Sequence, residues 1–288
     1  MPTNAEKRRA LRQALDGPDL VVAPSVGDPV SARLVQRSGL PAIHASGSVA
    51  HRMAGYADAG ILSLDEMIDR IVALTDSVDI PVIADADTGF GNVVNVVRTI
   101  KEYERAGAAA VHIEDQLTPK RPLHQPGVEG ECISREEMVG KVRAAVDART
   151  DEAFLIIARC EVKGNPQEVI DRLAAYVEAG ADAAWISGGN AEAVQALRKA
   201  IPGKAPLVGV LPRTVQAQQF KAWGANCGVL LGVMQIAALY AQDRMLEELK
   251  RTGSTAGYFA ALEDVDPIQT FYNYQGNAEL DDIMKRFG

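Results

Sequence analysis

Short apolar runs alternate with amphipathic segments along most of this chain. Continuous apolar, β-branched runs are typical of buried strands, whereas apolar positions three or four residues apart are typical of helices. The pattern predicts eight strands, at residues 20–26, 42–49, 81–87, 109–115, 154–161, 183–187, 206–211 and 228–232. Helices are predicted between them, for example at residues 63–77, 93–106, 135–149, 166–179 and 191–200.

The boundaries of these helices carry cap signals. Ser63, with Glu66 three residues later, is the pattern of a capping box at a helix start. Three helices end alike, in a glycine followed by an alanine and then a strand, at Gly107, Gly180 and Gly224. Eight strand–helix units favour an α/β fold of the TIM (β/α)8 barrel type. The alternative, a doubly wound sheet, would normally carry a glycine-rich phosphate-binding turn after its first strand, which residues 24–28 do not provide.

The pattern changes near the C-terminus. A long helix is predicted at residues 235–251, followed by shorter helical pieces at 257–263 and 279–287 around an aromatic cluster at 271–274. Because a barrel needs one closing helix, we expect a barrel domain at 1–240 and a C-terminal helical extension at 241–288. Packing of this extension on its own barrel and on a neighbouring subunit are both compatible with the sequence.

Composition narrows the class of protein. The 47% hydrophobic and 24% charged residues are ordinary for a globular protein, and the net charge of −8 argues against a nucleic-acid or anionic membrane partner. Residues 1–12 are polar, and no apolar run is long enough to cross a bilayer. Three widely spaced cysteines do not indicate a disulfide framework. We therefore expect a cytoplasmic protein.

Asp85 and Asp87 are the first candidates for chemistry. They follow the apolar run 80–84, and because strand side chains alternate, both point to one face at the strand's C-terminal end. Two such carboxylates are costly to bury without a cation, and Mg²⁺ (or Mn²⁺) is the natural partner. The alternative is a pair of aspartates that form a turn or cap a helix.

The other strand ends add matching groups, because a TIM barrel gathers its active site at the C-terminal ends of its strands. Small residues with free backbone N–H groups, carboxylates and cations all occur there: Ser46, Gly47, Ser48, Glu114, Asp115, Lys120, Arg121, His124, Arg159 and Glu161. Acidic groups for a metal beside cationic groups for an anion predict metal-assisted chemistry on a 2-oxo or 2-hydroxy acid.

Each of these groups also has a structural interpretation. Glu114 and Arg159 could form a buried structural ion pair, and Lys120 could be a solvated charge. His44 and His112 lie within predicted strands, which favours core or barrel-facing histidines over ligands. The coincidence of so many polar groups at consecutive strand ends favours the functional interpretation.

Four segments resemble the isocitrate lyase/phosphoenolpyruvate mutase superfamily. They are Asp-Ala-Asp-Thr-Gly-Phe-Gly-Asn at 85–92, Ile-Glu-Asp-Gln at 113–116, Ala-Arg at 158–159 and Ser-Gly-Ser-Val-Ala at 46–50, within a similarity that runs from about residue 10 to 240. The resemblance implies a TIM barrel, Mg²⁺ and a small anionic substrate related to pyruvate. It also implies a homotetramer, a dimer of dimers in which C-terminal helices are exchanged between subunits.

The resemblance further implies roles for individual residues. Asp87 would bind the metal directly, Asp85 and Glu114 would hold it through water, and Asp58 would lie in the same shell. Arg159 and the amides of residues 46–48 would bind the substrate's carboxylate and carbonyl oxygen.

The chain differs from the superfamily in the loop after the fourth strand. Lyases for isocitrate or methylisocitrate carry a cysteine acid there, and this chain has Pro122 between matching flanks. Residues 185–189 also lack the glutamate of the lyases and the histidine of the mutases.

A reaction that forms an enolate without a cysteine acid fits this sequence better. We expect decarboxylation of an oxaloacetate-like acid or retro-aldol cleavage of a 2-hydroxy dicarboxylate, with His124 or Glu161 as candidate acid–base groups. C–P chemistry on phosphonopyruvate and a non-catalytic dicarboxylate-binding paralogue are the alternatives.

Overall fold

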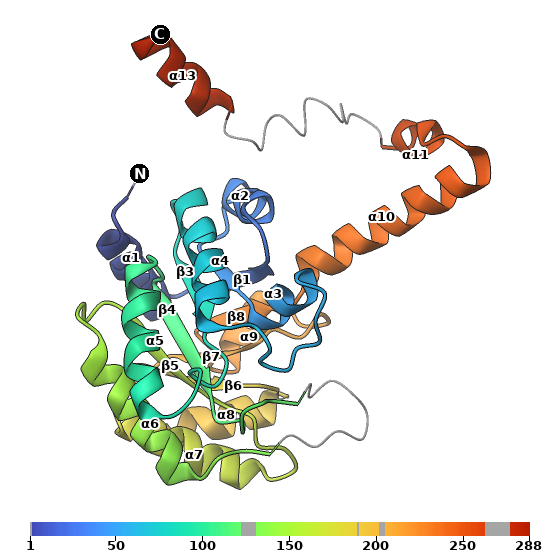
Figure 1. The fold of residues 1–288 in the computed structure, drawn as a ribbon. Coiled ribbons are helices and arrows are strands. Elements are labelled where there is room, and N and C mark those ends of the chain that lie inside the picture. Colours follow the sequence, from blue (N-terminus) through green and yellow to red (C-terminus); the bar gives the residue numbers. More distant parts are fainter. Residues whose placement is uncertain (1, 122–130, 189, 202–204, 263–276) are drawn as a thin grey trace. The chain divides into compact units, whose positions relative to one another are not determined.

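Eight parallel strands form a closed barrel in the computed structural model (Figure 1), which describes residues 2–121, 131–188, 190–201, 205–262 and 277–288. The strands pair in chain order, and β8 pairs back to β1. Their bounds are β1 Val21–Val26, β2 Ile43–Ala45, β3 Val82–Asp85, β4 Ala110–Glu114, β5 Leu155–Cys160, β6 Ala183–Ile186, β7 Leu207–Val210 and β8 Cys227–Leu230. The predicted TIM barrel is confirmed.

Helices connect successive strands and surround the barrel (Figure 1). Their bounds are α1 Asn4–Asp16, α2 Pro29–Arg37, α3 Gly47–Met53, α4 Leu64–Ser77, α5 Val93–Arg105, α6 Arg135–Ala148, α7 Pro166–Glu178, α8 Ala191–Ala200 and α9 Ala217–Ala222. The predicted capping box is present at α4, where Ser63 and Glu66 each accept the other's backbone N–H. The predicted C-cap glycines are confirmed by the left-handed φ values of Gly107 (89°), Gly180 (111°) and Gly224 (111°).

Three predicted strands extend at least two residues past their observed ends, and one of them is 81–87, since β3 ends at Asp85. The strand at 42–49 is too long, because β2 ends at Ala45 and α3 begins at Gly47. Ser46 causes this early change: its side chain accepts the Val49 N–H at 3.3 Å and so caps a helix. The last strand is Cys227–Leu230 rather than 228–232.

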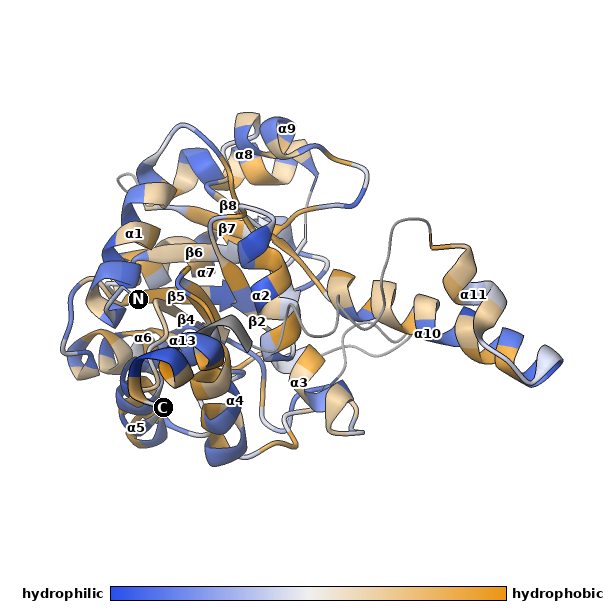
Figure 2. Cartoon of the chain, turned by 90° about the horizontal axis from the view of Figure 1, so that it is seen from above, coloured by the Kyte–Doolittle hydropathy of each residue, from blue (hydrophilic) through white to orange (hydrophobic). Residues whose placement is uncertain are grey.

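The chain divides into two compact units, Met1–Gly232 and Val233–Gly288. The second contains α10 (Val233–Thr252), α11 (Ala256–Ala260) and α13 (Asn277–Phe287), whereas the aromatic cluster 271–274 lies outside the described residues. No side chain of α10 is buried, and Figure 2 shows hydrophobic residues along it. Of the helices that the structure describes, none has the length and apolarity needed to cross a membrane.

The barrel interior changes from apolar to polar along its axis. At the N-terminal end, Leu11 and Leu15 of α1 pack with apolar strand residues such as Ile83 and Ile157. Helix α1 is fixed there by buried Lys7, whose Nζ donates to the Thr75 and Val78 carbonyls at 2.9 and 2.5 Å. A polar layer of His44, His112 and Asp85 lies in the barrel interior towards the opposite, C-terminal end.

The packing of α1 generates a first prediction. Leu15 is 1% exposed, so Leu15→Ala should leave a cavity under the barrel and lower the free energy of unfolding by about 2–5 kcal/mol. Urea unfolding followed by circular dichroism measures this. Val94→Ala is the control, because Val94 is 73% exposed and its truncation should change little. Equal effects of the two substitutions would contradict this packing.

Candidate active site

Asp85 is the last residue of β3, and Asp87 lies in the turn that follows, which has an unusual backbone conformation. Asp87 has a φ of 47° and Phe90 a φ of 60°, and a bulky residue in this left-handed region costs about 1 kcal/mol. Neighbouring helices hold the turn in place through its carbonyl groups. The Tyr103 hydroxyl donates to the Asp85 carbonyl at 2.8 Å, and Lys141 Nζ donates to the Thr88 carbonyl at 3.0 Å.

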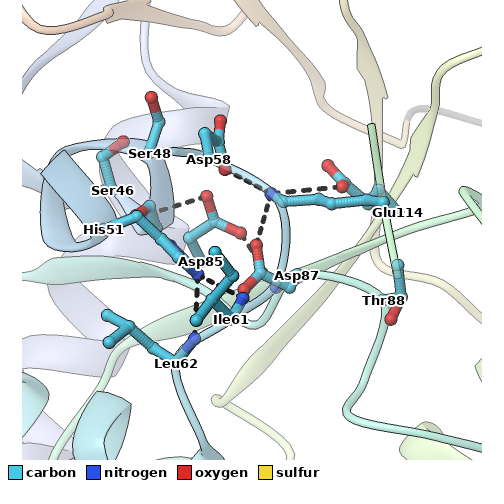
Figure 3. A network of polar contacts seen from close by, with 12 residues as sticks. Ser46, Ser48, His51, Asp58, Ile61, Leu62, Asp85, Asp87, Thr88 and Glu114 are labelled. Atoms are coloured by element: carbon cyan, nitrogen blue, oxygen red, sulfur yellow. Dashed lines mark hydrogen bonds and ion pairs between the residues drawn. The ribbon is translucent and has the colours of Figure 1, made fainter. Parts of the chain in front are cut away.

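Lys120 lies among three carboxylates from three segments. Figure 3 labels these carboxylates, which belong to Asp58, Asp87 and Glu114. Its Nζ is 2.9 Å from Asp58 Oδ1 and 3.4 Å from Glu114 Oε1, and it forms an ion pair with Asp87 Oδ1. The Lys120 side chain is only 5% exposed. Burial alone would lower the pKa of Lys120, but the carboxylates, Glu114 foremost, raise it well above its usual value. Lys120 therefore carries the positive charge that holds this cluster together.

Asp85 and Asp87 differ in their hydrogen bonds. Asp85 accepts the Gly47 N–H at 2.9 Å and the Asp87 N–H at 3.0 Å. Apart from ion pairs with Lys120, Asp58 Oδ1, Glu114 Oε1 and both Asp87 oxygens have no hydrogen-bond partner within the described part of the chain. Burial raises the pKa of Asp87, and it raises that of Glu114 to about 7. Such buried oxygens fit a hard divalent cation.

Gly47 allows these carboxylates to approach the start of α3. A Cβ at this position would lie 2.9 Å from Asp85 Oδ2 and 3.1 Å from Asp87 Oδ1, which is too close. The Gly47 N–H donates to Asp85, so the structure uses this predicted substrate-binding amide within the protein. Ser46 caps the helix, and the Ser48 hydroxyl accepts from Arg52.

Arg159 extends the cluster across β5. Its Nη1 is 3.3 Å from Glu114 Oε2, and its Nη2 is 2.5 Å from Glu161 Oε1. The expected Glu114–Arg159 ion pair is thus present, but the other Glu114 oxygen faces Lys120, so the pair belongs to the same network. Ser187 at the end of β6 accepts from Arg159 Nε at 3.0 Å and donates to Glu161. Sequence reasoning missed Ser187, since a lone serine at a strand end carries no specific signal.

Two histidines inside the barrel connect to Asp85. His44 Nε2 and His112 Nε2 are 2.9 Å apart, and His112 Nδ1 is 3.6 Å from Asp85 Oδ1. These three residues offer ligand atoms within 4.8 Å of one another and form a second group that could hold a metal. Both histidines are buried and face the barrel interior, as the sequence indicated. Their mutual contact was not predictable, because β3 separates their strands.

The loop after β4 is described only in part. Lys120 lies in the cluster and Arg121 is exposed beside it. Pro122 and His124 fall outside the described residues, so the predicted role of His124 stays a prediction.

Comparison with known proteins identifies the family. The sequence profile of the phosphoenolpyruvate phosphomutase family matches residues 11–250. The 2,3-dimethylmalate lyase of Eubacterium barkeri is 36% identical over 283 residues, which cover 95% of this chain and 92% of that protein. The chain therefore belongs to this family, within the isocitrate lyase/phosphoenolpyruvate mutase superfamily, and is an enzyme of that superfamily.

Solved structures agree with this assignment. A phosphoenolpyruvate phosphomutase from Streptomyces platensis superposes with a TM-score of 0.90 at 33% identity, covering 97% of this chain and 99% of that one. A phosphonopyruvate hydrolase in complex with oxalate and Mg²⁺ superposes with a TM-score of 0.87 at 33% identity, covering 98% and 99%. The closed barrel and the positions of its connecting helices are thus shared with enzymes of this family.

The Lys120 contacts generate a second prediction. In Lys120→Met the three carboxylates lose their shared cation, so the variant in EDTA should be less stable to urea by about 3 kcal/mol. Added Mg²⁺ should stabilise the variant more than the wild type, because the cation then displaces no ammonium group.

Arg98→Met is the control for this experiment. Arg98 forms an exposed ion pair with Asp65, which should contribute less than about 1 kcal/mol. A Lys120→Met variant that is as stable as the wild type in EDTA would contradict the mutual repulsion of the cluster.

Proposed function

We propose that this enzyme is a Mg²⁺-dependent lyase that cleaves a C–C bond beside a 2-oxo or 2-hydroxy carboxylate. The observation that carries the proposal is the group of buried carboxylates around one ammonium at the C-terminal end of the barrel, next to Arg159. This end is where TIM barrels carry out their chemistry. Buried carboxylate oxygens without hydrogen-bond donors favour a hard cation over a neutral ligand.

The metal ligands follow from the hydrogen bonds of the carboxylates. Asp87 is the direct ligand, because its oxygens accept no hydrogen bond within the described residues. Asp85 already accepts two N–H groups, so it would hold the cation through water. For Glu114 and Asp58 the contact through water rests on the superfamily resemblance, since one oxygen of each also lacks a hydrogen-bond partner within the described residues. When bound, Mg²⁺ (or Mn²⁺) would polarise the substrate's oxo or hydroxy oxygen and stabilise the negative charge of an enolate.

The cationic side chains of the site bind the anionic substrate. The guanidinium of Arg159 is held by Glu161 and Ser187, so it presents a fixed positive group to a carboxylate. Lys120 would be freed from these carboxylates with a divalent cation bound, and its ammonium would then be a second anion-binding group, with Arg121 beside it. Glu161 and His124 are the proposed acid–base groups, since Pro122 has no proton to give.

Sequence identity alone does not separate a C–C lyase from C–P chemistry, because a phosphonopyruvate hydrolase of Variovorax is as similar as 2,3-dimethylmalate lyase, at 36% identity. A C–C lyase is favoured because residues 185–189 lack the histidine that the superfamily resemblance implies for the mutases. Phosphonopyruvate chemistry is the second candidate, because the phosphomutase and the phosphonopyruvate hydrolase share this fold at 33% identity. Oxaloacetate, methylisocitrate and phosphonopyruvate, offered separately with Mg²⁺ and then with EDTA, distinguish the candidates by the product released.

The metal role of Asp87 provides the third prediction. Asp87→Asn keeps the shape of the side chain but removes its charge, so kcat/KM should fall by about a thousandfold on whichever acid is turned over. Asp69→Asn, at an exposed position, is the control and should retain activity. Product release that survives both EDTA and Asp87→Asn would contradict a metal-dependent reaction. Binding of oxalate with Mg²⁺ but no turnover of any acid would favour a non-catalytic paralogue.

We further propose that α10 is an intersubunit helix of a homotetramer. Its side chains are unburied, and its large apolar residues are exposed at Ile236, Leu239, Tyr240, Leu246 and Leu249. An exposed row of large apolar residues on a helix is typical of an oligomer interface. Exchange of this helix between subunits would cover the row.

The interface role of α10 gives the fourth prediction. Leu239→Asp combined with Leu246→Asp should lower the mass of the assembly in sedimentation velocity, because two charges would enter an apolar contact. Ala237→Asp adds a charge to the same helix away from these leucines and serves as the control. A double variant that sediments like the wild type would show that this row is not an interface.

A further inference from the structure

A buried polar layer lies directly beneath the carboxylate cluster. Ser25, His44, His112 and Trp185 are all 0% exposed and come from β1, β2, β4 and β6. Since β3 lies between β2 and β4, the contact between the two imidazoles crosses the barrel interior. A polar layer is unusual in the closed interior of a barrel, where bulky apolar residues are the rule.

The layer forms a chain that leads to Asp85. The Ser25 hydroxyl is 2.8 Å from His44 Nδ1, and His44 Nε2 is 2.9 Å from His112 Nε2. His112 Nδ1 ends the chain, 3.6 Å from Asp85 Oδ1. This last nitrogen has no hydrogen-bond partner within the described residues, and it is fully buried. A buried polar nitrogen without a hydrogen-bond partner costs about 1–3 kcal/mol of stability, so the presence of His112 at this place needs an explanation.

The chemistry of Asp85 fixes the direction of every hydrogen in this chain. An ionised carboxylate only accepts hydrogen bonds, so the His112 nitrogen that faces it must carry the proton. His112 Nε2 is then an acceptor, which requires that His44 Nε2 carries a proton. His44 Nδ1 in turn accepts from the hydroxyl of Ser25. The two imidazoles must therefore be opposite tautomers.

The surroundings support two neutral rings. Both rings are 0% exposed, where a charged imidazolium is costly to bury, and at the Nε2–Nε2 contact one of the two nitrogens must be an acceptor. Trp185 packs against both rings, with centroid distances of 5.5 Å to His44 and 4.3 Å to His112. The same indole lies 5.2 Å from the Arg159 guanidinium, which opposes a second positive charge nearby.

We propose that His112 is a positioning residue for Asp85, and that Ser25 and His44 hold its Nδ1–H towards the carboxylate. The hydrogen bonds of Asp85 come from the backbone N–H groups of Gly47 and Asp87, and His112 Nδ1 faces its Oδ1 at 3.6 Å. Together with these two donors, the positive end of the Nδ1–H group favours one rotation of the carboxylate about its Cβ–Cγ bond, and thereby one direction of the lone pairs that it offers to the metal shell. The proposal rests on the metal-binding function proposed above. Loss of an outer-shell partner of a metal-binding carboxylate typically weakens metal binding by about 10–100-fold.

The tautomers can be read without any metal or substrate. The chain has four histidines, so ¹⁵N-histidine labelling with magic-angle-spinning NMR gives a simple spectrum, assigned by single substitutions. In a sample at about pH 7.5 we expect His44 as the Nε2–H tautomer and His112 as the Nδ1–H tautomer. Two identical tautomers, or an imidazolium at His112, would overturn the proposal. Because this readout needs no turnover, its failure is distinct from failure of the lyase assignment.

Metal affinity tests the consequence of this arrangement. Mn²⁺ titration followed by electron paramagnetic resonance should show binding about 10–100-fold weaker in His112→Phe, whereas His112→Asn keeps a donor near the Nδ1 position and should stay within about threefold of the wild type. His44→Phe, which leaves His112 free to change tautomer, should resemble His112→Phe. Equal weakening in His112→Asn and His112→Phe would overturn the proposal. Nitrogen hyperfine coupling from a directly bound imidazole would also overturn it, because the histidines would then be ligands themselves.

Discussion

Mutual repulsion among carboxylates governs the C-terminal end of this barrel. Asp85, Asp87 and Glu114 are almost completely buried, and Lys120 lies between Asp87, Glu114 and Asp58. Like charges gathered around one ammonium in a poorly solvated interior are strongly unfavourable, so the site requires positive charge. In the described structure Lys120 supplies it from one side and Arg159 from the other. A divalent cation would satisfy the same requirement more completely.

Much of the local structure is explained by this requirement. Gly47 leaves room for two carboxylates that any side chain would displace. The left-handed backbone at Asp87 turns its carboxylate towards Lys120, and the hydrogen bond from Tyr103 to the Asp85 carbonyl stabilises the turn. Below, the histidine pair continues the polar network into a barrel that is otherwise filled by hydrocarbon. Backbone strain and buried polar groups are thus concentrated around the carboxylate cluster.

Strand alternation made part of the site predictable. It places Arg159 with Glu161 on one face, and these two side chains form an ion pair. Asp85 and Asp87 also come together, but Asp87 lies beyond the end of β3 in a left-handed turn, so alternation does not explain its position. The fold itself was predictable because strand and helix signals recur along the chain.

Contacts that depend on closure of the barrel were not predictable. The sequence could not reveal that Lys120 centres on three carboxylates, that Ser187 holds Arg159 or that His44 meets His112, because each contact joins segments far apart in the chain. The helix at 47–53 was missed for a different reason. Small residues after an apolar run fit a strand end as well as a helix start, and the cap formed by Ser46 decides between them.

We propose above that a divalent cation binds among the carboxylates at Asp87. Diffraction from crystals grown with Mn²⁺ and oxalate, measured at a wavelength where manganese scatters anomalously, tests this binding most directly. We expect one strong anomalous peak beside the Asp87 carboxylate, with Glu114 and Asp58 around it. Lys120 Nζ should be displaced from its present contacts with the carboxylates. A peak between His44 and His112, or no peak near Asp87 with Lys120 still among the carboxylates, would contradict this proposal.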